Sequence, residues 1–299
     1  MRCCFIISGS LEALPNIYLL EEFPPAAAEH CQRLFHTILP TDPEVKNWRN
    51  NATAILVREQ IISAGDVFQA KNLKAIGKQG VGIDIIGQDA CAKKKIPILN
   101  TPGANAQSVA ELVLSLTMAV ARQLRPIVVK QAANQAVRKE HCSGITLQGK
   151  TIGGIVGMGN IGLAVARIFR RAFGSPALAY DPFAPKDAWH DIENTRVDNV
   201  EEMLPHLDIL TLHLPLTPKT RNFISSPQLQ FMKKDAILIN GSRRLDCHDE
   251  EPPTLKRYEK LWATGRLIST PHIVATTRET QVHTATTALS RVYEFLTTN

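Results

Sequence analysis

The sequence predicts an α/β protein with two domains, each a parallel β-sheet wound on both faces by helices. Three observations support this. A chain of 299 residues is long enough for two cores. Apolar strand-like segments alternate with helix-like segments, which is typical of parallel sheets. A glycine-rich turn stands between a strand and a helix near the middle of the chain. The fractions of hydrophobic (44%) and charged (21%) residues are those of an ordinary soluble protein.

The first hundred residues predict one doubly wound domain. The expected strands are Ile17–Leu20, Thr37–Leu39, Ala54–Val57, Leu73–Ile76 and Ile96–Leu99. The expected helices are Ala26–Phe35, Pro43–Asn51, Ala64–Ala70 and Ile83–Lys94. We expect this domain to comprise residues 1–104 together with the closing helix in 276–299.

The second domain is expected over residues 105–275, after a hinge at Gly103–Asn105. Its first helix, Asn105–Arg122, is apolar on nearly every face, which predicts burial between domains or between subunits. The further expected helices are Ile127–Arg138, Leu163–Arg171, Val200–Leu207, Pro227–Met232 and, closing the chain, Glu279–Leu296. The expected strands are Ile152–Val156, Ala177–Tyr180, Thr195–Val197, Ile209–Leu214, Ala236–Ile239 and Leu267–Ile273.

The glycine-rich turn has G-x-G-x-x-G spacing at Gly157, Gly159 and Gly162. The first glycine makes a tight turn, the second lets the backbone approach a pyrophosphate, and the third lets helix and strand pack closely. The motif alone is weak, but a second strand ends at Asp181, near the spacing of about 20 residues expected for an acid that holds the adenosine ribose. Asp181 would repel a 2′-phosphate and Pro182–Phe183 offers no cation, so NAD is favoured over NADP.

Charge and cysteine usage restrict the partners. The net charge is +6, but the basic residues form no stripe, so we expect no nucleic acid and a small anionic substrate instead. The six cysteines lack metal-ligand spacing, which predicts reduced thiols in a cytoplasmic protein without a metal site. No segment reaches the roughly 20 apolar residues of a membrane span. Met1–Ser8 is too short and too weakly apolar for a signal peptide.

Four further stretches have the composition of ligand-binding loops. They are Gly80–Asp84, His213–Thr217, Asn240–Arg244 and Thr270–His272. Gly80–Asp84 and Asn240–Arg244 follow an expected strand, and the other two stand at the end of one, where open α/β sheets bind ligands. Taken singly, a tight turn, a solvated arginine and an exposed histidine explain such residues as well. The acidic cluster Asp249–Glu251 adds weight to His272, because a carboxylate partner raises the pKa of an imidazole and orients it.

Together these motifs resemble those of the D-isomer-specific 2-hydroxyacid dehydrogenases, the family that contains 3-phosphoglycerate dehydrogenase. Beside the glycine turn, the matching segments are K-Q-G-V-G-I-D (78–84), L-N-T-P-G (99–103), V-A-E-L-V-L (109–114), L-H-L-P-L-T (212–217), L-I-N (238–240), L-D-x-x-x-E-E-P (245–252) and T-P-H (270–272). The resemblance implies a flavodoxin-like substrate domain, a Rossmann NAD-binding domain and a homodimer.

The resemblance also implies roles for individual residues. The N–H groups of Val81 and Gly82 would bind the substrate carboxylate, and Arg58 is similar to a residue that touches a substrate phosphate, although Glu59 beside it argues against this. Arg243 would hold the carboxylate and the carbonyl oxygen, His272 would be the acid–base and Glu251 its partner. The implied cofactor-binding residues are Gly157, Gly159, Asn160, Ile161, Gly162, Asp181, His213, Pro215, Thr217 and Asp246. In the reducing direction, hydride passes from NADH to C2 of a 2-oxo acid while protonated His272 supplies a proton.

The chain departs from the family between Arg243 and Asp246, where only Arg244 and Leu245 intervene. In the family these positions end successive parallel strands, and a parallel crossover takes about a dozen residues or more. The chain therefore lacks one helix–strand unit, as expected of a coding stretch removed from the gene model or of a splice variant. We expect weak or no activity. A non-catalytic NAD(H)-binding sensor, like the family's corepressor branch, is the alternative, and a degenerate remnant is a third. The sequence is compatible with phosphoglycerate, glyoxylate, hydroxypyruvate and bulkier oxo acids.

Overall fold

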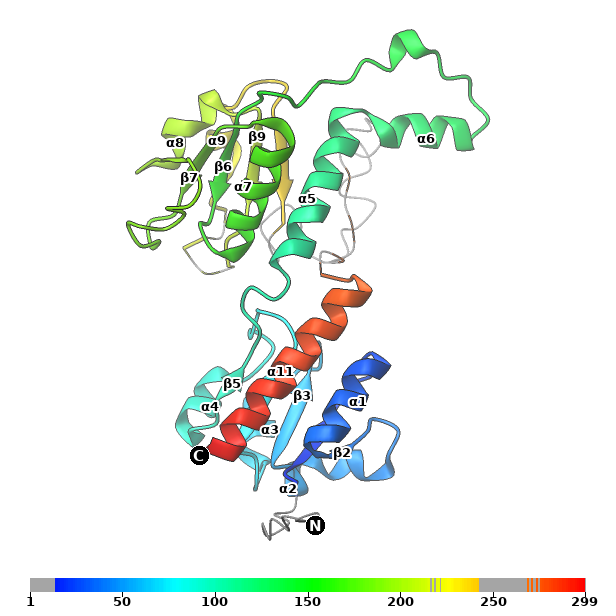
Figure 1. Cartoon of the computed structure of the whole chain (residues 1–299), viewed down its shortest axis with the longest axis vertical. Coiled ribbons are helices and arrows are strands. Elements are labelled where there is room, and N and C mark those ends of the chain that lie inside the picture. Colours follow the sequence, from blue (N-terminus) through cyan, green and yellow to red (C-terminus); the bar gives the residue numbers. More distant parts are fainter. Residues whose placement is uncertain are drawn as a thin grey trace, which may run out of the picture. The chain divides into compact units, whose positions relative to one another are not determined.

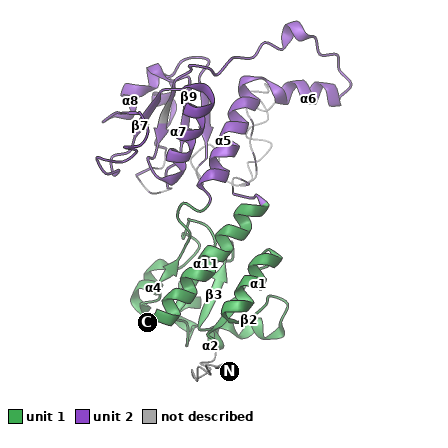
Figure 2. Cartoon of the chain, in the orientation of Figure 1, with its two compact units in different colours: residues 1–104, 278–299 green, residues 105–277 purple. Residues whose placement is uncertain are grey.

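The computed structural model describes residues 14–215, 217, 219–220, 222–241, 268, 270, 273 and 275–298. The chain divides into two compact units (Figure 2). Unit 1 combines Met1–Ala104 with Arg278–Asn299, and unit 2 is Asn105–Thr277. The last helix of the chain therefore belongs to unit 1, together with the N-terminal segment.

Unit 1 contains a five-stranded parallel sheet in the order β2-β1-β3-β4-β5; strands β2, β3 and β5 are labelled in Figure 1. The strands are β1 (Asn16–Leu19), β2 (His36–Ile38), β3 (Ala54–Val57), β4 (Ala75–Lys78) and β5 (Ile98–Leu99). This order is that of flavodoxin-like folds, which bind ligands beyond the carboxyl ends of their strands.

Helices cover both faces of this sheet. The helical elements are α1 (Pro25–Leu34), the 3-10 turn η1 (Pro43–Asn47), α2 (Trp48–Asn51), α3 (Ala64–Gln69), α4 (Gln88–Lys94) and α11 (Arg278–Thr298). Successive side chains of a strand point to opposite faces. Accordingly, Ile17 and Leu56 pack with Leu289 of α11 in one cluster, and Tyr18 and Ile55 lie in the cluster on the other face. Alternate side chains of the strands thus fill two cores, one on each face of the sheet.

Unit 2 also contains a five-stranded parallel sheet, in the order β10-β9-β6-β7-β8. Its strands are β6 (Ile152–Val156), β7 (Ala177–Tyr180), β8 (Thr195–Arg196), β9 (Ile209–Leu212) and β10 (Ile237–Asn240). Counted along the chain, this is the order 3-2-1-4-5 of a Rossmann fold. The helical elements are α5 (Ala106–Ala121), α6 (Leu124–Ala132), η2 (Lys139–His141), α7 (Asn160–Phe173), α8 (Val200–Met203), η3 (Leu204–His206) and α9 (Ser226–Leu229).

Most elements coincide with the prediction to within three residues, and three differ by more. The helix predicted over Ile83–Lys94 begins only at Gln88, because Ile86 pairs with Ile62 in an isolated β-bridge. The helix predicted over Ile127–Arg138 runs from Leu124 to Ala132 and is followed by Asn134 in a left-handed conformation (φ 57°). Of the predicted strand Leu267–Ile273, residues 268, 270 and 273 are described and lie outside any strand. Its other residues fall outside the described part.

The apolar helix α5 is buried along one side only. That side packs against α7, and its buried residues include Val109, Ala110 and Val113. Burial of its other side between domains or between subunits stays a prediction. In the part of the chain that the structure describes, no single helix is long and apolar enough to span a membrane. Only the pair α5–α6, which is bent by 69°, has together the length and composition of a membrane span.

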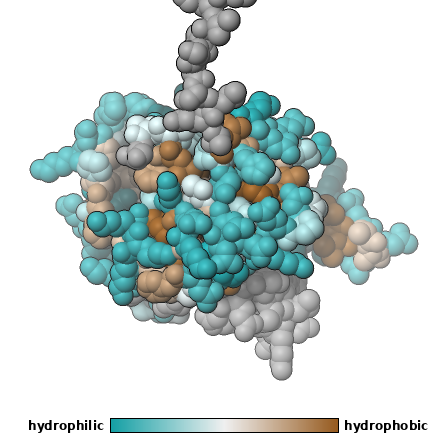
Figure 3. All heavy atoms as spheres, turned by 90° about the horizontal axis from the view of Figure 1, so that it is seen from below, coloured by the Kyte–Doolittle hydropathy of each residue, from teal (hydrophilic) through white to brown (hydrophobic). Residues whose placement is uncertain are grey.

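The surface of unit 1 is largely polar. Figure 3 shows a face on which polar residues surround separate apolar areas. The large exposed apolar side chains of unit 1 are those of Leu14, Ile61, Phe68 and Val81.

Candidate cofactor and substrate sites

The glycine turn connects the end of β6 to the start of α7, as predicted. Gly157 has a φ of 103°, and a Cβ there would lie 2.7 Å from the carbonyl oxygen of His213. A Cβ on Gly162 would overlap the carbonyl oxygen of Gly157. Both positions therefore require glycine, the first for its backbone conformation and the second for close packing of α7 on the strand.

The remaining glycine of the motif borders open space. A Cβ on Gly159 would meet no atom within 4 Å. The helix α7 begins at the next residue, Asn160, and no side chain caps its N-terminus. Its first backbone N–H groups, those of Asn160, Ile161 and Gly162, have no acceptor within the helix. An uncapped helix start beside free space fits a phosphate group, so the residues present suit the pyrophosphate of a dinucleotide.

Asp181 follows β7 and is held by two backbone donors. Its Oδ2 accepts from the N–H of Met158 at 2.9 Å, and its Oδ1 accepts from the N–H of Phe183 at 2.9 Å. Each carboxylate oxygen retains a lone pair for a ribose hydroxyl. The guanidinium of Arg196 lies nearby but donates to the carbonyl oxygens of Asp181 (2.6 Å), Ala184 and Pro185 (both 2.9 Å). Three of the five N–H donors of Arg196 are thus engaged by backbone carbonyl oxygens.

His213 comes directly after β9. Both ring nitrogens are buried without a hydrogen-bond partner in the described part of the chain. Burial lowers the pKa of His213 to about 4, so the ring is neutral at physiological pH. The ring lies close to Gly241, where a Cβ would be 3.2 Å from Nδ1. The His213 ring thus lies beside Gly241, which follows β10, and the His213 carbonyl oxygen lies beside Gly157 of the glycine turn.

Pro215 and Thr217 are exposed and are held by a residue that sequence reasoning missed. The Thr220 hydroxyl donates to the carbonyl oxygen of Pro215 at 2.6 Å and accepts from the N–H of Thr217 at 2.8 Å. This small network gives the segment after His213 a defined backbone path.

The candidate substrate loop, Gly80–Gly82, follows β4. It is fixed on two sides, because the N–H of Gly80 donates to Thr101 Oγ1 (3.0 Å) and Asn100 Nδ2 donates to the Val81 carbonyl oxygen (2.6 Å). Among the described residues, the N–H groups of Val81 and Gly82 have no acceptor in the structure. A turn with two free N–H groups suits a carboxylate.

Two buried polar residues beside this loop were missed by sequence reasoning. Lys78 is only 2% exposed, and its Nζ donates to the carbonyl oxygen of Gln79 at 2.5 Å. The Gln79 amide donates to Gln281 Oε1 and Thr284 Oγ1 of α11, both at 3.0 Å. Lys78 ends β4, where a hydrophobic pattern does not reveal a buried lysine, and it places its Nζ beside Gly80 of the loop.

The segment after β3, which carries Arg58, is held at both ends. At its start, Glu21 accepts from the N–H groups of Arg58 (2.5 Å) and Glu59 (3.0 Å). The Nε of Arg58 is buried without a partner in the described part of the chain. An acid thus occupies the backbone donors where a substrate phosphate would be expected.

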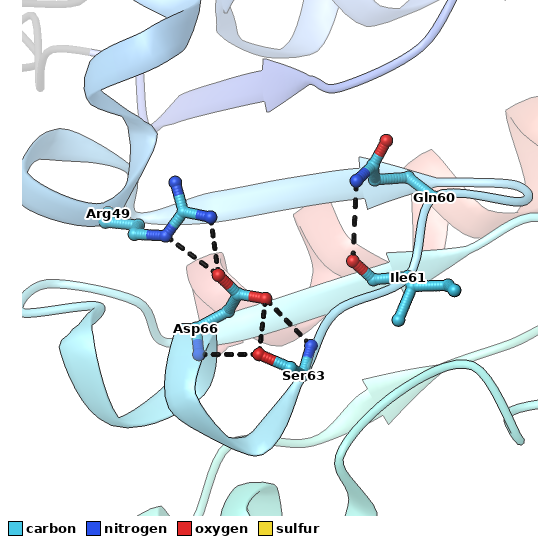
Figure 4. Close-up of polar contacts among 5 residues, drawn as sticks. All are labelled: Arg49, Gln60, Ile61, Ser63 and Asp66. Atoms are coloured by element: carbon cyan, nitrogen blue, oxygen red, sulfur yellow. Dashed lines mark hydrogen bonds and ion pairs between the residues drawn. The ribbon is translucent and has the colours of Figure 1, made fainter.

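At its other end, the segment enters α3 through a capping box formed by Ser63 and Asp66 (Figure 4). Arg49 Nε donates to Asp66 Oδ1 at 2.9 Å, and the Ser63 N–H donates to Oδ2 at 2.9 Å. Burial opposes ionisation of Asp66, but the hydrogen bonds from Ser63 and Arg49 outweigh it and lower the pKa of the carboxyl.

The remaining candidates, Arg243, Asp246, Glu251 and His272, lie outside the described residues. An open pocket of about 320 Å³ is lined by the segment between β7 and β8, which includes Lys186 and Trp189, and by Arg196 of β8. None of the predicted site residues lines it. Across the described ranges, no group of three or more His, Cys, Asp or Glu side chains is placed to hold a metal ion.

Comparisons with known proteins give the family. Residues 114–244 match the family model for the D-isomer specific 2-hydroxyacid dehydrogenase, NAD binding domain. This match lies within unit 2 and ends at Arg244, where the sequence departs from the expected crossover. NAD is therefore the cofactor of this unit.

Relatives and solved structures agree. The chain is 34% identical over 278 residues to a D-3-phosphoglycerate dehydrogenase of Methanocaldococcus jannaschii, covering 86% of this chain and 52% of that protein. It is 33% identical to a hydroxypyruvate reductase of Thermotoga maritima, covering 81% of this chain and 84% of the relative. A crystal structure of a protein from Thermus thermophilus superposes with a TM-score of 0.80 at 26% identity, covering 95% and 97% of the two chains. The chain thus spans about half the length of the phosphoglycerate dehydrogenase it matches, and it belongs to the D-isomer specific 2-hydroxyacid dehydrogenase family.

Proposed function

We propose that this protein is an NAD-dependent oxidoreductase of the D-2-hydroxyacid type, which binds NAD(H) on unit 2 and a small anionic 2-hydroxy or 2-oxo acid on unit 1. The observation that carries the proposal is the pairing of an open, uncapped α7 start at Gly159 with the anchored carboxylate of Asp181. The first suits a pyrophosphate and the second an adenosine ribose.

The substrate side rests on the loop Gly80–Gly82. The free N–H groups of Val81 and Gly82 would take the substrate carboxylate, and the Nζ of the buried Lys78 lies close by. Bound NADH supplies the hydride. By family position, Arg243 would stabilise the negative charge on the carbonyl oxygen and protonated His272 would give that oxygen its proton, with Glu251 orienting the imidazole and Asp246 meeting the nicotinamide carboxamide.

The short connection from Arg243 to Asp246 predicts weak turnover by this polypeptide. Two intervening residues cannot form a parallel crossover, so Arg243, Glu251 and His272 would not reach their family positions together. A misplacement of about 1 Å can cost on the order of a hundredfold in rate. The same observation favours a second candidate function, a non-catalytic NAD(H)-binding sensor.

A turnover assay separates these functions. NADH oxidation would be followed with glyoxylate, pyruvate, hydroxypyruvate and its 3-phosphate as substrates, and cDNA would be sequenced across the codons for Arg243 to Asp246. We expect weak turnover by this chain, and full turnover by a longer protein if the cDNA supplies in-frame codons for a helix and a strand. Turnover by the present chain at a rate typical of dehydrogenases would contradict the predicted break.

We also propose a homodimer formed through unit 2. The helix α6 exposes Leu124, Val128 and Val129, the last two by 60% and 55%, and α5 leaves one apolar side incompletely covered. Light scattering is expected to give twice the chain mass for the wild type and the chain mass for Val128→Glu. As a control, Phe68→Glu in unit 1, where Phe68 is 54% exposed, should leave the mass unchanged. A monomeric wild type would refute this proposal.

We infer a cytoplasmic location. The described cysteines Cys31, Cys91 and Cys142 are all free thiols, which supports a reducing compartment.

A further inference from the structure

We propose that Trp189 is a positioning residue for the pyrophosphate-binding turn. Its indole N–H holds the carbonyl of Met158 and thereby sets the direction of the Gly159 N–H. The inference rests on the proposed NAD(H) site of unit 2 and assigns a task there to the segment between β7 and β8, which none of the sequence motifs includes.

Trp189 contacts the glycine turn at two points. The side chain is 5% exposed, and its Nε1 donates to the Met158 carbonyl oxygen at 3.0 Å in a buried environment. The six-membered ring lies over Gly162, where a Cβ would be 3.1 Å from Cζ2. The glycine at position 162 therefore makes room for Trp189 as well as for the backbone of Gly157.

The bond to Met158 acts on the next residue through the peptide plane. The carbonyl of Met158 and the N–H of Gly159 belong to one planar trans peptide and point in opposite directions. Holding that carbonyl at Trp189 directs the Gly159 N–H away from the indole. The Met158 N–H is also engaged, by Asp181 at 2.9 Å. Both polar groups of Met158 are thus held, which restrains a glycine-flanked turn that would otherwise have wide conformational freedom.

The backbone at Trp189 indicates that its surroundings hold it in place. Its φ is 63°, a left-handed conformation that a bulky residue adopts only when neighbouring contacts enforce it. Two ion pairs join its segment to α7, one between Asp191 and Arg167 and the other between Glu193 and Arg170. The segment is therefore attached to the helix that starts at the turn.

Trp189→Phe tests the inference, because it keeps an aromatic ring and removes the N–H donor together with part of the indole. Dissociation constants for NADH and ADP-ribose would be measured on the full chain by calorimetry, and that for adenosine by saturation-transfer NMR. We expect NADH and ADP-ribose to bind about tenfold more weakly, the effect of losing one buried hydrogen bond at the turn. Adenosine, which lacks the pyrophosphate, should change by less than about twofold because Asp181 is still held by two backbone donors. Trp48→Phe in unit 1 should leave all three unchanged.

Three outcomes would overturn the inference. Unchanged NADH binding by Trp189→Phe would show that the hydrogen bond does not position the turn. Equal losses for NADH and adenosine, with a lower melting temperature, would mean that Trp189 is only structural. If Trp189→Phe does not fold, ¹⁵N NMR of the indole N–H groups of the wild type takes its place, with the signals assigned by means of Trp48→Phe and Trp262→Phe. Rapid exchange of the Trp189 indole hydrogen with solvent while NADH is bound would contradict the inference. A wild type that binds no NADH would instead refute the proposed cofactor site.

Discussion

Replacing Gly162 by alanine is expected to lower the free energy of unfolding of unit 2 by about 3 kcal/mol, the upper range for overpacking a close contact. The new methyl group would overlap the Gly157 carbonyl oxygen and press on Ile155 and Trp189. Most of these neighbours cannot move, because Gly157 is backbone and Ile155 is fully buried in the core. The helix α7 would have to shift away from β6.

Urea denaturation of the full chain, followed by far-UV circular dichroism, measures this effect. Gly65→Ala in α3 is the matched control, because its methyl group would meet only Ser63 Oγ at 3.6 Å. We expect the control to be neutral or slightly stabilising, since alanine favours helix over glycine by up to about 1 kcal/mol. A Gly162→Ala variant that unfolds at the same urea concentration as the wild type would contradict the packing described.

Acid is expected to destabilise the protein through His213. The folded-state pKa of about 4 lies below the usual 6.5, because burial disfavours the charged ring. Between these two values the unfolded chain binds a proton at His213 and the folded chain does not. The free energy of unfolding therefore falls as pH falls across this window, by up to about 1.4 kcal/mol per pH unit.

The contribution of His213 is separated from that of other groups by comparing variants. His213→Leu should reduce the slope of unfolding free energy against pH between 6.5 and 4, whereas His206→Gln, which changes an exposed histidine, should retain the wild-type slope. If the wild type and His213→Leu lose stability in parallel, the ring is not held neutral by burial.

Local patterns were sufficient to predict most of the fold. The alternation of strand-like and helix-like segments predicted nearly all the strands, and the glycine spacing predicted the turn between β6 and α7, because these signals are local in the sequence. The family assignment followed from the same segments and is confirmed by the matching relatives.

Long-range contacts account for what the sequence did not reveal. The bridge between Ile62 and Ile86 delays the start of α4, and nothing near Ile83 indicates a partner so far away along the chain. Lys78 lies two residues beyond the predicted strand Leu73–Ile76, but it ends β4 and is buried. Trp189 lies in a polar segment without a motif, and only the folded chain brings its indole to Met158.

The roles of Arg243, Asp246, Glu251 and His272 stay predictions. The family model ends at Arg244, at the point where the sequence lacks the expected crossover. The pyrophosphate and ribose part of the proposal does not depend on these residues, because the glycine turn and Asp181 lie within the described part of unit 2.

Titration of NADH into the full chain, with Gly159→Ala measured in parallel, tests the central claim most directly. The backbone at Gly159 (φ −74°) accepts alanine without strain, and the added methyl group meets no protein atom within 4 Å, so the variant should fold normally. The methyl group would occupy the approach of the pyrophosphate. We predict saturable NADH binding by the wild type, and at least about tenfold weaker binding by Gly159→Ala, a loss of about 1.4 kcal/mol. Absence of binding by the wild type, or equal binding by both proteins, would contradict the cofactor site described.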